Sequence, residues 1–314
     1  ERLPRSRKFI SSNRKIITPM KVLVLGASGL VGGNCVKVFE SKENVDVVGT
    51  YFSFETENTV FFDTLNPQNP ENFNVDEFKP NVIVHCGALT HVDYCEDHQE
   101  ESYQKTVQST LNAIELCKKF NAKLVYLSTD YVFDGTKGFY KEEDEVNPLS
   151  IYGKHKLEAE LAVKKELADF VIVRITNVYG DEVRGKNFIA RLSVNMQKGE
   201  PMELRLPYDQ YATPANAFDI AKAIWLLVND KKVGIYHFGS TDYLNRIQLC
   251  QKVAQYFGHD KVVINPISTK EMNQAADRPL LGGFSTEKFI KEYPGFYFSN
   301  VDDYLKKLKL NSTY

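Results

Sequence analysis

The sequence predicts an α/β fold, with helices on both faces of a parallel sheet and a smaller α/β lobe after it. Three observations lead to this prediction. Short apolar runs alternate with helix-like segments over roughly the first 180 residues. The first run ends in a glycine-rich turn at Gly26, as a buried parallel strand does before a helix. After Gly180 the alternation loosens, which indicates a second lobe. Alternating strands and helices imply right-handed crossovers and hence a parallel sheet.

The individual elements follow from hydrophobic periodicity and from the glycines and prolines between them. The expected strands span residues 21–25, 45–51, 59–62, 82–86, 123–128, 170–175, 201–206 and 235–238. The expected helices span residues 30–41, 99–120, 187–198, 216–229, 246–257 and 301–308, with one more that holds Tyr152. This order predicts a Rossmann-like doubly wound sheet. Residues 20–180 would form the dinucleotide-binding domain, with returning segments near 214–240. Residues 181–213 and 241–314 would form the C-terminal α/β substrate lobe.

The composition is that of a globular protein. The 314 residues are 43% hydrophobic and 25% charged, which is ordinary for a folded chain with a large core. No apolar run approaches the roughly 18 residues that a membrane span needs, so we expect no membrane partner. The five cysteines are scattered and odd in number, which favours reduced thiols and a cytoplasmic location.

Residues 1–19 differ from the rest, with six Lys or Arg against one acid, Glu1. We expect this basic extension to derive from an expression vector, with the natural start at Met20, while a targeting or phosphate-binding arm is the alternative. The remaining chain has 33 basic against 40 acidic residues. Because it lacks a basic excess, we expect no nucleic-acid partner.

Tyr152 and Lys156 stand four residues apart at an expected helix start, so both side chains share one helix face. A phenol has an ordinary pKa near ~10, and an ammonium ~5 Å away would lower it by about two units. Tyrosine could then act as an acid–base catalyst. Taken alone, the spacing is more typical of an ordinary aromatic–basic pair. The glycine turn upstream favours the catalytic interpretation over the ordinary pair.

Gly26-Ala-Ser-Gly29-Leu-Val-Gly32 lies between an expected strand and helix, where glycines let the backbone approach a pyrophosphate. A carboxylate at the end of the second strand would bind the NAD ribose. That strand ends in Gly49-Thr-Tyr-Phe-Ser53 without one, which favours NADP(H). No arginine lies close by in the sequence to hold a 2′-phosphate. Glu55, slightly further on, keeps NAD(H) open.

Several longer motifs accompany the turn in a fixed order. They are Ala88-Leu-Thr-His-Val-Asp93, Ser128-Thr129-Asp130-Tyr131-Val-Phe-Asp-Gly135, Pro148-Leu-Ser-Ile-Tyr-Gly-Lys154, Arg174-Ile-Thr-Asn-Val-Tyr-Gly180 and Asp209-Gln-Tyr-Ala-Thr-Pro214. With them the chain, from Met20 to about Phe289, resembles the extended short-chain dehydrogenase/reductases. Within these it looks most like the dTDP-4-dehydrorhamnose reductase branch of rhamnose biosynthesis.

Carried over by position, the resemblance implies that Thr129 binds the substrate carbonyl, Tyr152 donates the proton and Lys156 binds the nicotinamide ribose and lowers the tyrosine pKa. Asp130 would contact the sugar, and Asn177 the sugar or the diphosphate. The implied cofactor residues are Gly26, Ser28, Gly29, Leu30 and Gly32 at the pyrophosphate, Asp63 and Thr64 at the adenine, and Gly87 and Ala88 at the middle of the cofactor. The chain departs from the family at His85-Cys86 and Thr106, where relatives often carry Asn, and at Ala212-Thr213-Pro214. These departures leave the sugar specificity open.

Arginines downstream of the sixth strand are candidates for the substrate diphosphate, because the guanidinium fork suits phosphate. They are Arg184, Arg191, Arg205, Arg246 and Arg278. Taken singly, each is more typical of an ordinary surface or salt-bridge arginine. We expect Arg278, beside a proline, as the first choice and Arg191 as the second. A cluster of metal-ligand types is formed by His85, Cys86, His91, Cys95 and His98. Its spacing matches no standard zinc pattern, so we expect no metal.

The reaction implied is NADP(H)-dependent reduction of the C4 ketone of a nucleoside-diphosphate 4-keto-6-deoxy sugar, with the nucleotide sugar as partner. A homodimer is compatible with this interpretation. The alternative is a cofactor-binding regulatory subunit, since the branch also resembles the methionine adenosyltransferase β-subunit. Dehydration is disfavoured, because dehydratases of this superfamily usually place Asp-Glu where this chain has Asp130-Tyr131.

Overall fold

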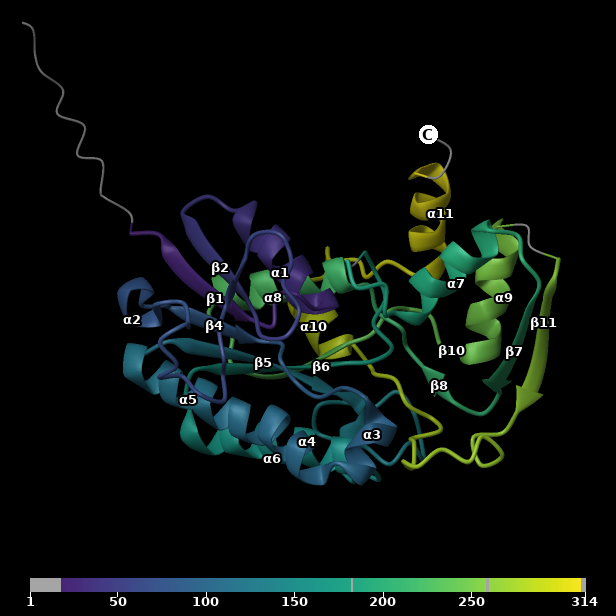
Figure 1. Ribbon diagram of the computed structural model, residues 1–314, viewed down its shortest axis with the longest axis horizontal. Helices are drawn as coiled ribbons and strands as arrows, with labels where there is room; N and C mark the ends of the chain where they lie inside the picture. The colour runs from purple at the N-terminus through teal and green to yellow at the C-terminus, as the bar shows by residue number, and fades with distance from the viewer. Residues whose placement is uncertain (1–17, 182, 258–259, 312–314) are drawn as a thin grey trace, which may run out of the picture.

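The computed structural model describes residues 18–181, 183–257 and 260–311. Of the basic extension expected at residues 1–19, residues 1–17 lie outside this range. The described chain forms a layered α/β part and, beside it, a smaller lobe (Figure 1). Within the described residues, no helix is both long and apolar enough to cross a membrane.

A seven-stranded parallel sheet forms the centre of the larger part. Its strands are β1 (Met20–Leu25), β2 (Val45–Tyr51), β3 (Thr59–Phe61), β4 (Val82–His85), β5 (Lys123–Thr129), β6 (Phe170–Ile175) and β9 (Gly234–Phe238). Their order is β3-β2-β1-β4-β5-β6-β9, and every neighbouring pair is parallel. The order reverses direction between β1 and β4, and ligands of such sheets bind at that point, beside the carboxyl ends of the strands. The predicted doubly wound sheet is therefore confirmed.

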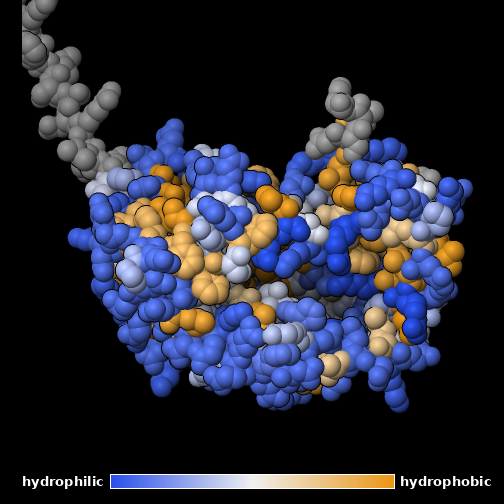
Figure 2. Space-filling view, viewed as in Figure 1, coloured by the Kyte–Doolittle hydropathy of each residue, from blue (hydrophilic) through white to orange (hydrophobic). Residues whose placement is uncertain are grey.

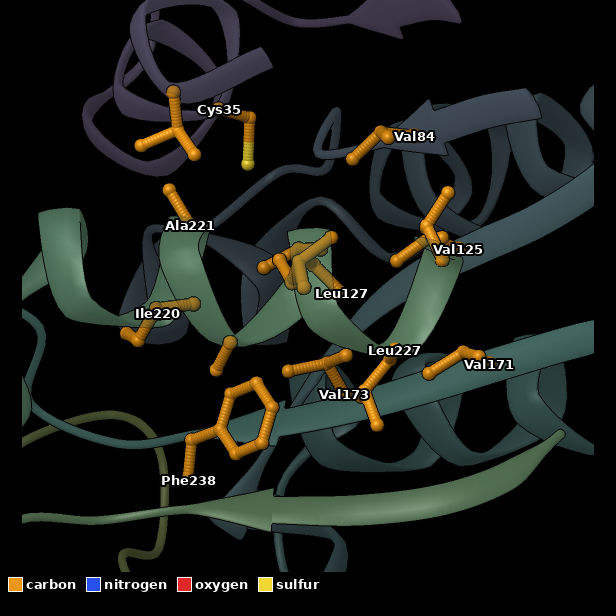
Figure 3. Close-up of a cluster of buried hydrophobic side chains, with 14 of the residues drawn as sticks. Cys35, Val84, Val125, Leu127, Val171, Val173, Ile220, Ala221, Leu227 and Phe238 are labelled. Atoms are coloured by element: carbon orange, nitrogen blue, oxygen red, sulfur yellow. The ribbon is translucent and has the colours of Figure 1, made fainter. Parts of the chain in front are cut away.

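Helices cover both faces of this sheet. One face carries α1 (Leu30–Glu40), α8 (Ala217–Asn229) and α10 (Glu287–Glu292), and the other carries α2 (Val75–Phe78), α5 (Ser109–Phe120) and α6 (Ile151–Glu166). On the first face, α8 lays Ile220, Ala221 and Leu227 against valines of the central strands (Figure 3). The sheet is rigid because both of its faces are buried in apolar contacts.

The predicted helix over residues 99–120 is interrupted. It divides into α4 (Gln99–Tyr103), a π-helical turn (Gln104–Gln108) and α5, and it is preceded by the short α3 (Val92–Asp97). Such π-helical turns are frequent at functional sites. Thr106, at the middle of this turn, is buried.

The smaller lobe has its own apolar core. Its elements are α7 (Phe188–Gln197), β7 (Met202–Pro207), β8 (Tyr211–Ala212), β10 (Leu244–Asn245), α9 (Arg246–Phe257), β11 (Val262–Ile267) and α11 (Val301–Asn311). β7 pairs with β11 in parallel, and β8 pairs with β10 antiparallel. β11 has no counterpart among the strands expected from the sequence. This strand has a single partner and is partly exposed, so its apolar signal is weak.

The C-terminal segment does not stay in the smaller lobe throughout. Phe289 and Phe298 belong to the core on the α1–α8 face of the large sheet, and α10 packs against β9. The expected lobe range 241–314 includes these residues, whereas their aromatic rings are buried with the dinucleotide-binding part. The chain thus crosses between the two parts more often than the sequence alone predicts.

Candidate active site

A cavity of about 710 Å³ opens at the carboxyl ends of β1, β4, β5 and β6, between the sheet and the smaller lobe. The space-filling view shows the surface hollowed in this place (Figure 2). Its volume is within the range that holds a cofactor and a substrate. It is lined by all of the predicted cofactor residues: Gly26, Ser28, Gly29, Leu30, Gly32, Asp63, Thr64, Gly87, Ala88, Tyr152 and Lys156.

The glycine turn brings bare backbone to the cavity. Gly26 has a φ of +81°, a left-handed conformation that favours glycine. A Cβ atom at Gly32 would lie 2.4 Å from the carbonyl oxygen of Gly26, so no larger residue fits there. Gly29 precedes α1 and no side chain caps it, so the first N–H groups of the helix are free to bind an anion.

Thr129, Tyr152 and Lys156 meet at the opposite side of the same cavity. Thr129 is the last residue of β5, and its hydroxyl oxygen accepts a hydrogen bond from the backbone N–H of Tyr131 at 3.2 Å. Tyr152 and Lys156 lie on the inner face of α6 and are buried. The Ser150 hydroxyl caps this helix by accepting from the backbone N–H of Gly153 at 3.2 Å. The cap defines where the helix starts and hence where Tyr152 points.

Electrostatics at this site differ from the expectation. The Nζ of Lys156 donates to the carbonyl oxygen of Leu127 at 2.5 Å and lies 4.2 Å from the centre of the Tyr126 ring. Burial lowers the pKa of Lys156 to about 7. Burial also raises the pKa of Tyr152, while its hydrogen bond with Thr129 acts in the opposite direction.

The predicted lowering of the Tyr152 pKa by Lys156 is therefore wrong for this structure. The reason is that desolvation disfavours both the phenolate and the ammonium, so it acts against each partner of the expected pair. Tyr152 is consequently a protonated phenol at neutral pH, which suits a proton donor. Lys156 loses its proton near neutral pH more readily than an exposed lysine.

Asp130 also lines the cavity, directly after Thr129. Its Oδ2 accepts a hydrogen bond from the hydroxyl of Thr176 at 2.6 Å, and burial raises its pKa. The 3₁₀ turn Asp130–Val132 places this carboxyl group beside Thr129 in the cavity lining. The contact with the sugar that the resemblance implies for Asp130 stays a prediction.

A second, smaller cavity of about 230 Å³ adjoins the first through Asn177 and Lys186, which line both. It also contains Arg191 and Arg246. Arg246, the first residue of α9, donates from Nη2 to the Oδ1 of Asn177 at 3.0 Å, and its guanidinium stacks on the Phe188 ring. Three cations and one amide thus converge beside the end of the main cleft. Such a set suits a diphosphate.

Arg278, the expected first choice for phosphate, is placed differently. Its guanidinium makes a two-point ion pair with Asp93, with Nη1–Oδ1 at 2.9 Å and Nη2–Oδ2 at 2.7 Å. It is not among the described residues that line either cavity. The pair joins the first turn of α3, which contains Asp93, to the segment around Arg278 that follows β11, so it holds the two parts together. Arg191, the expected second choice, lines the smaller cavity, and its phosphate role stays a prediction.

Arg246 is one of the five candidate arginines of the sequence but not one of the two preferred for phosphate, and Lys186 is not a candidate at all. No local motif marks them, because Arg246 reaches Asn177 from a helix 69 positions further along the chain. The metal-type cluster is also dispersed: His85 is wholly buried, with its pKa lowered by burial to about 3, while His98 is exposed. Within the described residues, no three His, Cys, Asp or Glu side chains form a group that could hold a metal.

Comparison with known proteins leads to the same family as the sequence motifs. A curated dTDP-4-dehydrorhamnose reductase from Aggregatibacter actinomycetemcomitans is 29% identical over 271 residues, covering 82% of this chain and 88% of the relative. Methionine adenosyltransferase 2 subunit beta from Bos taurus is 29% identical over 272 residues, covering 83% and 77%. The crystal structure of a dTDP-4-dehydrorhamnose reductase from Bacillus anthracis in complex with NADP superposes with a TM-score of 0.80 at 26% identity, covering 93% and 99%. The family model described as the RmlD substrate binding domain matches residues 20–308, and the chain belongs to that family.

Proposed function

We propose that the protein is an NADP(H)-dependent reductase that converts the C4 ketone of a nucleoside-diphosphate 4-keto-6-deoxy sugar into a hydroxyl. The observation that carries the proposal is the meeting of Thr129, Tyr152 and Lys156 in one cavity with the glycine turn. The similarity to proteins named dTDP-4-dehydrorhamnose reductase supports the choice of substrate class.

In this proposal each residue acts on a stated atom. A dinucleotide held by the glycine turn Gly26–Gly32 would supply the hydride for C4 of the sugar. Thr129 donates a hydrogen bond to the C4 oxygen, where negative charge develops. Tyr152 gives its proton to that oxygen, and burial keeps the phenol protonated until then. Lys156, with a pKa near neutral, can return a proton to the phenolate.

The smaller cavity would hold the diphosphate of the substrate. Arg191, Arg246 and Lys186 supply cationic donors there, and Asn177 orients Arg246 through its hydrogen bond. Charge-assisted bonds from arginine to phosphate are short and strong, so this cavity would provide much of the binding free energy. The sugar would then extend from it along Asn177 toward Tyr152, since Asn177 lines both cavities.

The deciding experiment compares Tyr152→Phe with the unchanged protein. We expect NADPH to bind equally well, measured by nicotinamide fluorescence, because a phenyl ring keeps the packing. We expect turnover of dTDP-4-keto-6-deoxy sugars to fall by at least ~100-fold, because the proton donor is missing. Unchanged steady-state turnover would refute the catalytic role.

A second candidate is a regulatory subunit, favoured by the similarity to methionine adenosyltransferase 2 subunit beta. That function would need no proton donor beside the glycine turn. Co-purification with a synthetase, together with no NADPH consumption on any keto-sugar nucleotide, would favour it over the reductase.

For the location we propose the cytoplasm, supported by the cysteines of the described residues, all of which are free thiols. A homodimer stays a prediction.

A further inference from the structure

The tip of β2 presents no free carboxylate to the cleft. Phe52 and Ser53, which follow β2, line the cavity, whereas Glu55 is not among the described residues that line it. Asp63 lines the cavity nearby, but its Oδ1 already accepts the backbone N–H of Leu65 at 2.9 Å. In dinucleotide sites an acid here binds the ribose 2′-hydroxyl, and a cation accommodates a 2′-phosphate. The β2 segment itself supplies no such cation.

A cation reaches this place from the other side of the cleft. Arg184, in the segment between β6 and α7, lines the same cavity as Ser53. Its guanidinium lies 5.1 Å from the centre of the Phe54 ring. Among the described residues, no carboxylate forms an ion pair with it. Its donors are therefore available to a ligand bound beside Phe52 and Ser53.

Residues on both sides of Arg184 are tied to the fold. The carbonyl oxygen of Asp181 accepts a hydrogen bond from Asn34 of α1 at 3.3 Å, and its carboxylate pairs with Lys307 of α11 at 2.9 Å. On the other side, the Nδ2 of Asn187 donates to the carbonyl oxygen of Gly180 at 3.0 Å. The position of Arg184 over the β2 tip is thus set by anchors on α1 and on the smaller lobe.

We propose that Arg184 selects NADP(H) over NAD(H) by binding the 2′-phosphate from across the cleft, with the Ser53 hydroxyl as a second donor. The inference rests on the proposed function, because it needs a dinucleotide in the cleft. A guanidinium gives several N–H donors in a planar fork, which matches phosphate oxygens better than ammonium does. Stacking on Phe54 keeps this fork oriented at little cost in side-chain entropy.

The test measures binding, so it does not depend on turnover. NADPH and NADH are titrated by nicotinamide fluorescence, and 2′-AMP and 5′-AMP by calorimetry, against the unchanged protein and Arg184→Met. Removing the hydrogen bonds between the guanidinium and a charged phosphate should weaken binding by about 10- to 100-fold. We expect that loss for NADPH and 2′-AMP, with NADH and 5′-AMP changed less than about twofold. Arg205→Met, which removes the same charge from an exposed position on β7, should bind NADPH like the unchanged protein.

Two results would overturn the inference: NADPH binding unaffected by Arg184→Met, or an equal loss for NADPH and NADH. Arg184→Lys keeps the charge but not the fork, so its NADPH affinity should lie between those of the unchanged protein and Arg184→Met. This variant also controls for misfolding of the methionine variant. A different result would count against the proposed function itself. If the unchanged protein binds neither NADPH nor NADH, the cleft is not a dinucleotide site.

Discussion

Replacing Lys156 by methionine should change how stability depends on pH, and the structure gives the size of the change. The ammonium is wholly buried, and its pKa falls from the ordinary 10.5 to about 7 on folding. Below about pH 7 both folded and unfolded chains hold the proton, and the cost of burying the charge is greatest. Between about pH 7 and 10.5, Lys156 is mostly deprotonated in the folded chain but still protonated in the unfolded chain. The free energy of unfolding therefore rises with pH over this range. Between pH 7.5 and 9.5 the rise from this one group is about 2.5 kcal/mol.

Methionine has a similar volume and no charge, so Lys156→Met should lack this rise. The assay is urea unfolding of both proteins at pH 7.5, 8.5 and 9.5. The difference in unfolding free energy between them isolates Lys156, because the other titrating groups are common to both. The variant also loses the hydrogen bond to Leu127, which shifts the difference by a constant without changing its slope. A difference that stays flat from pH 7.5 to 9.5 would show that the lysine pKa is not depressed.

The remaining predictions concern the phosphate cavity, the buried ion pair and the glycine turn. Arg246→Met should raise KM for the nucleotide sugar at least ~10-fold while NADPH affinity stays constant, and an equal loss of both affinities would contradict its place in the smaller cavity. Arg174 makes a two-point ion pair with Glu160, at 2.9 and 2.7 Å, and both are buried. Arg174→Met should lower the unfolding free energy by about 3–5 kcal/mol, because Glu160 keeps a buried charge without its partner, and a loss under ~1 kcal/mol in urea unfolding would refute this. Gly32→Ala should abolish NADPH binding in the fluorescence titration, because its Cβ would collide with Gly26, whereas Gly295→Ala, with no heavy atom within 4 Å of the added Cβ, should bind normally.

The parts of this protein that depend on neighbours in the sequence were predictable. The strand–glycine–helix unit at Gly26 and the spacing of Tyr152 and Lys156 are local patterns, and the buried strands of a parallel sheet are short, nearly continuous apolar runs that stand out in the chain. The predicted cofactor residues therefore all line one cavity. Weak edge strands such as β11 carry too little apolar signal to be recognised.

Contacts between distant segments, and the solvation of buried charges, could be known only from the folded chain. Arg246 reaches Asn177 and Arg184 reaches Phe54 across long separations in the chain, whereas Arg278, which looked suited to phosphate, is paired with Asp93. The proton affinities of Tyr152 and Lys156 depend on how completely α6 and β5 exclude water from them. Residue types and spacing specify which groups are present, but burial and long-range packing set their partners and their charge.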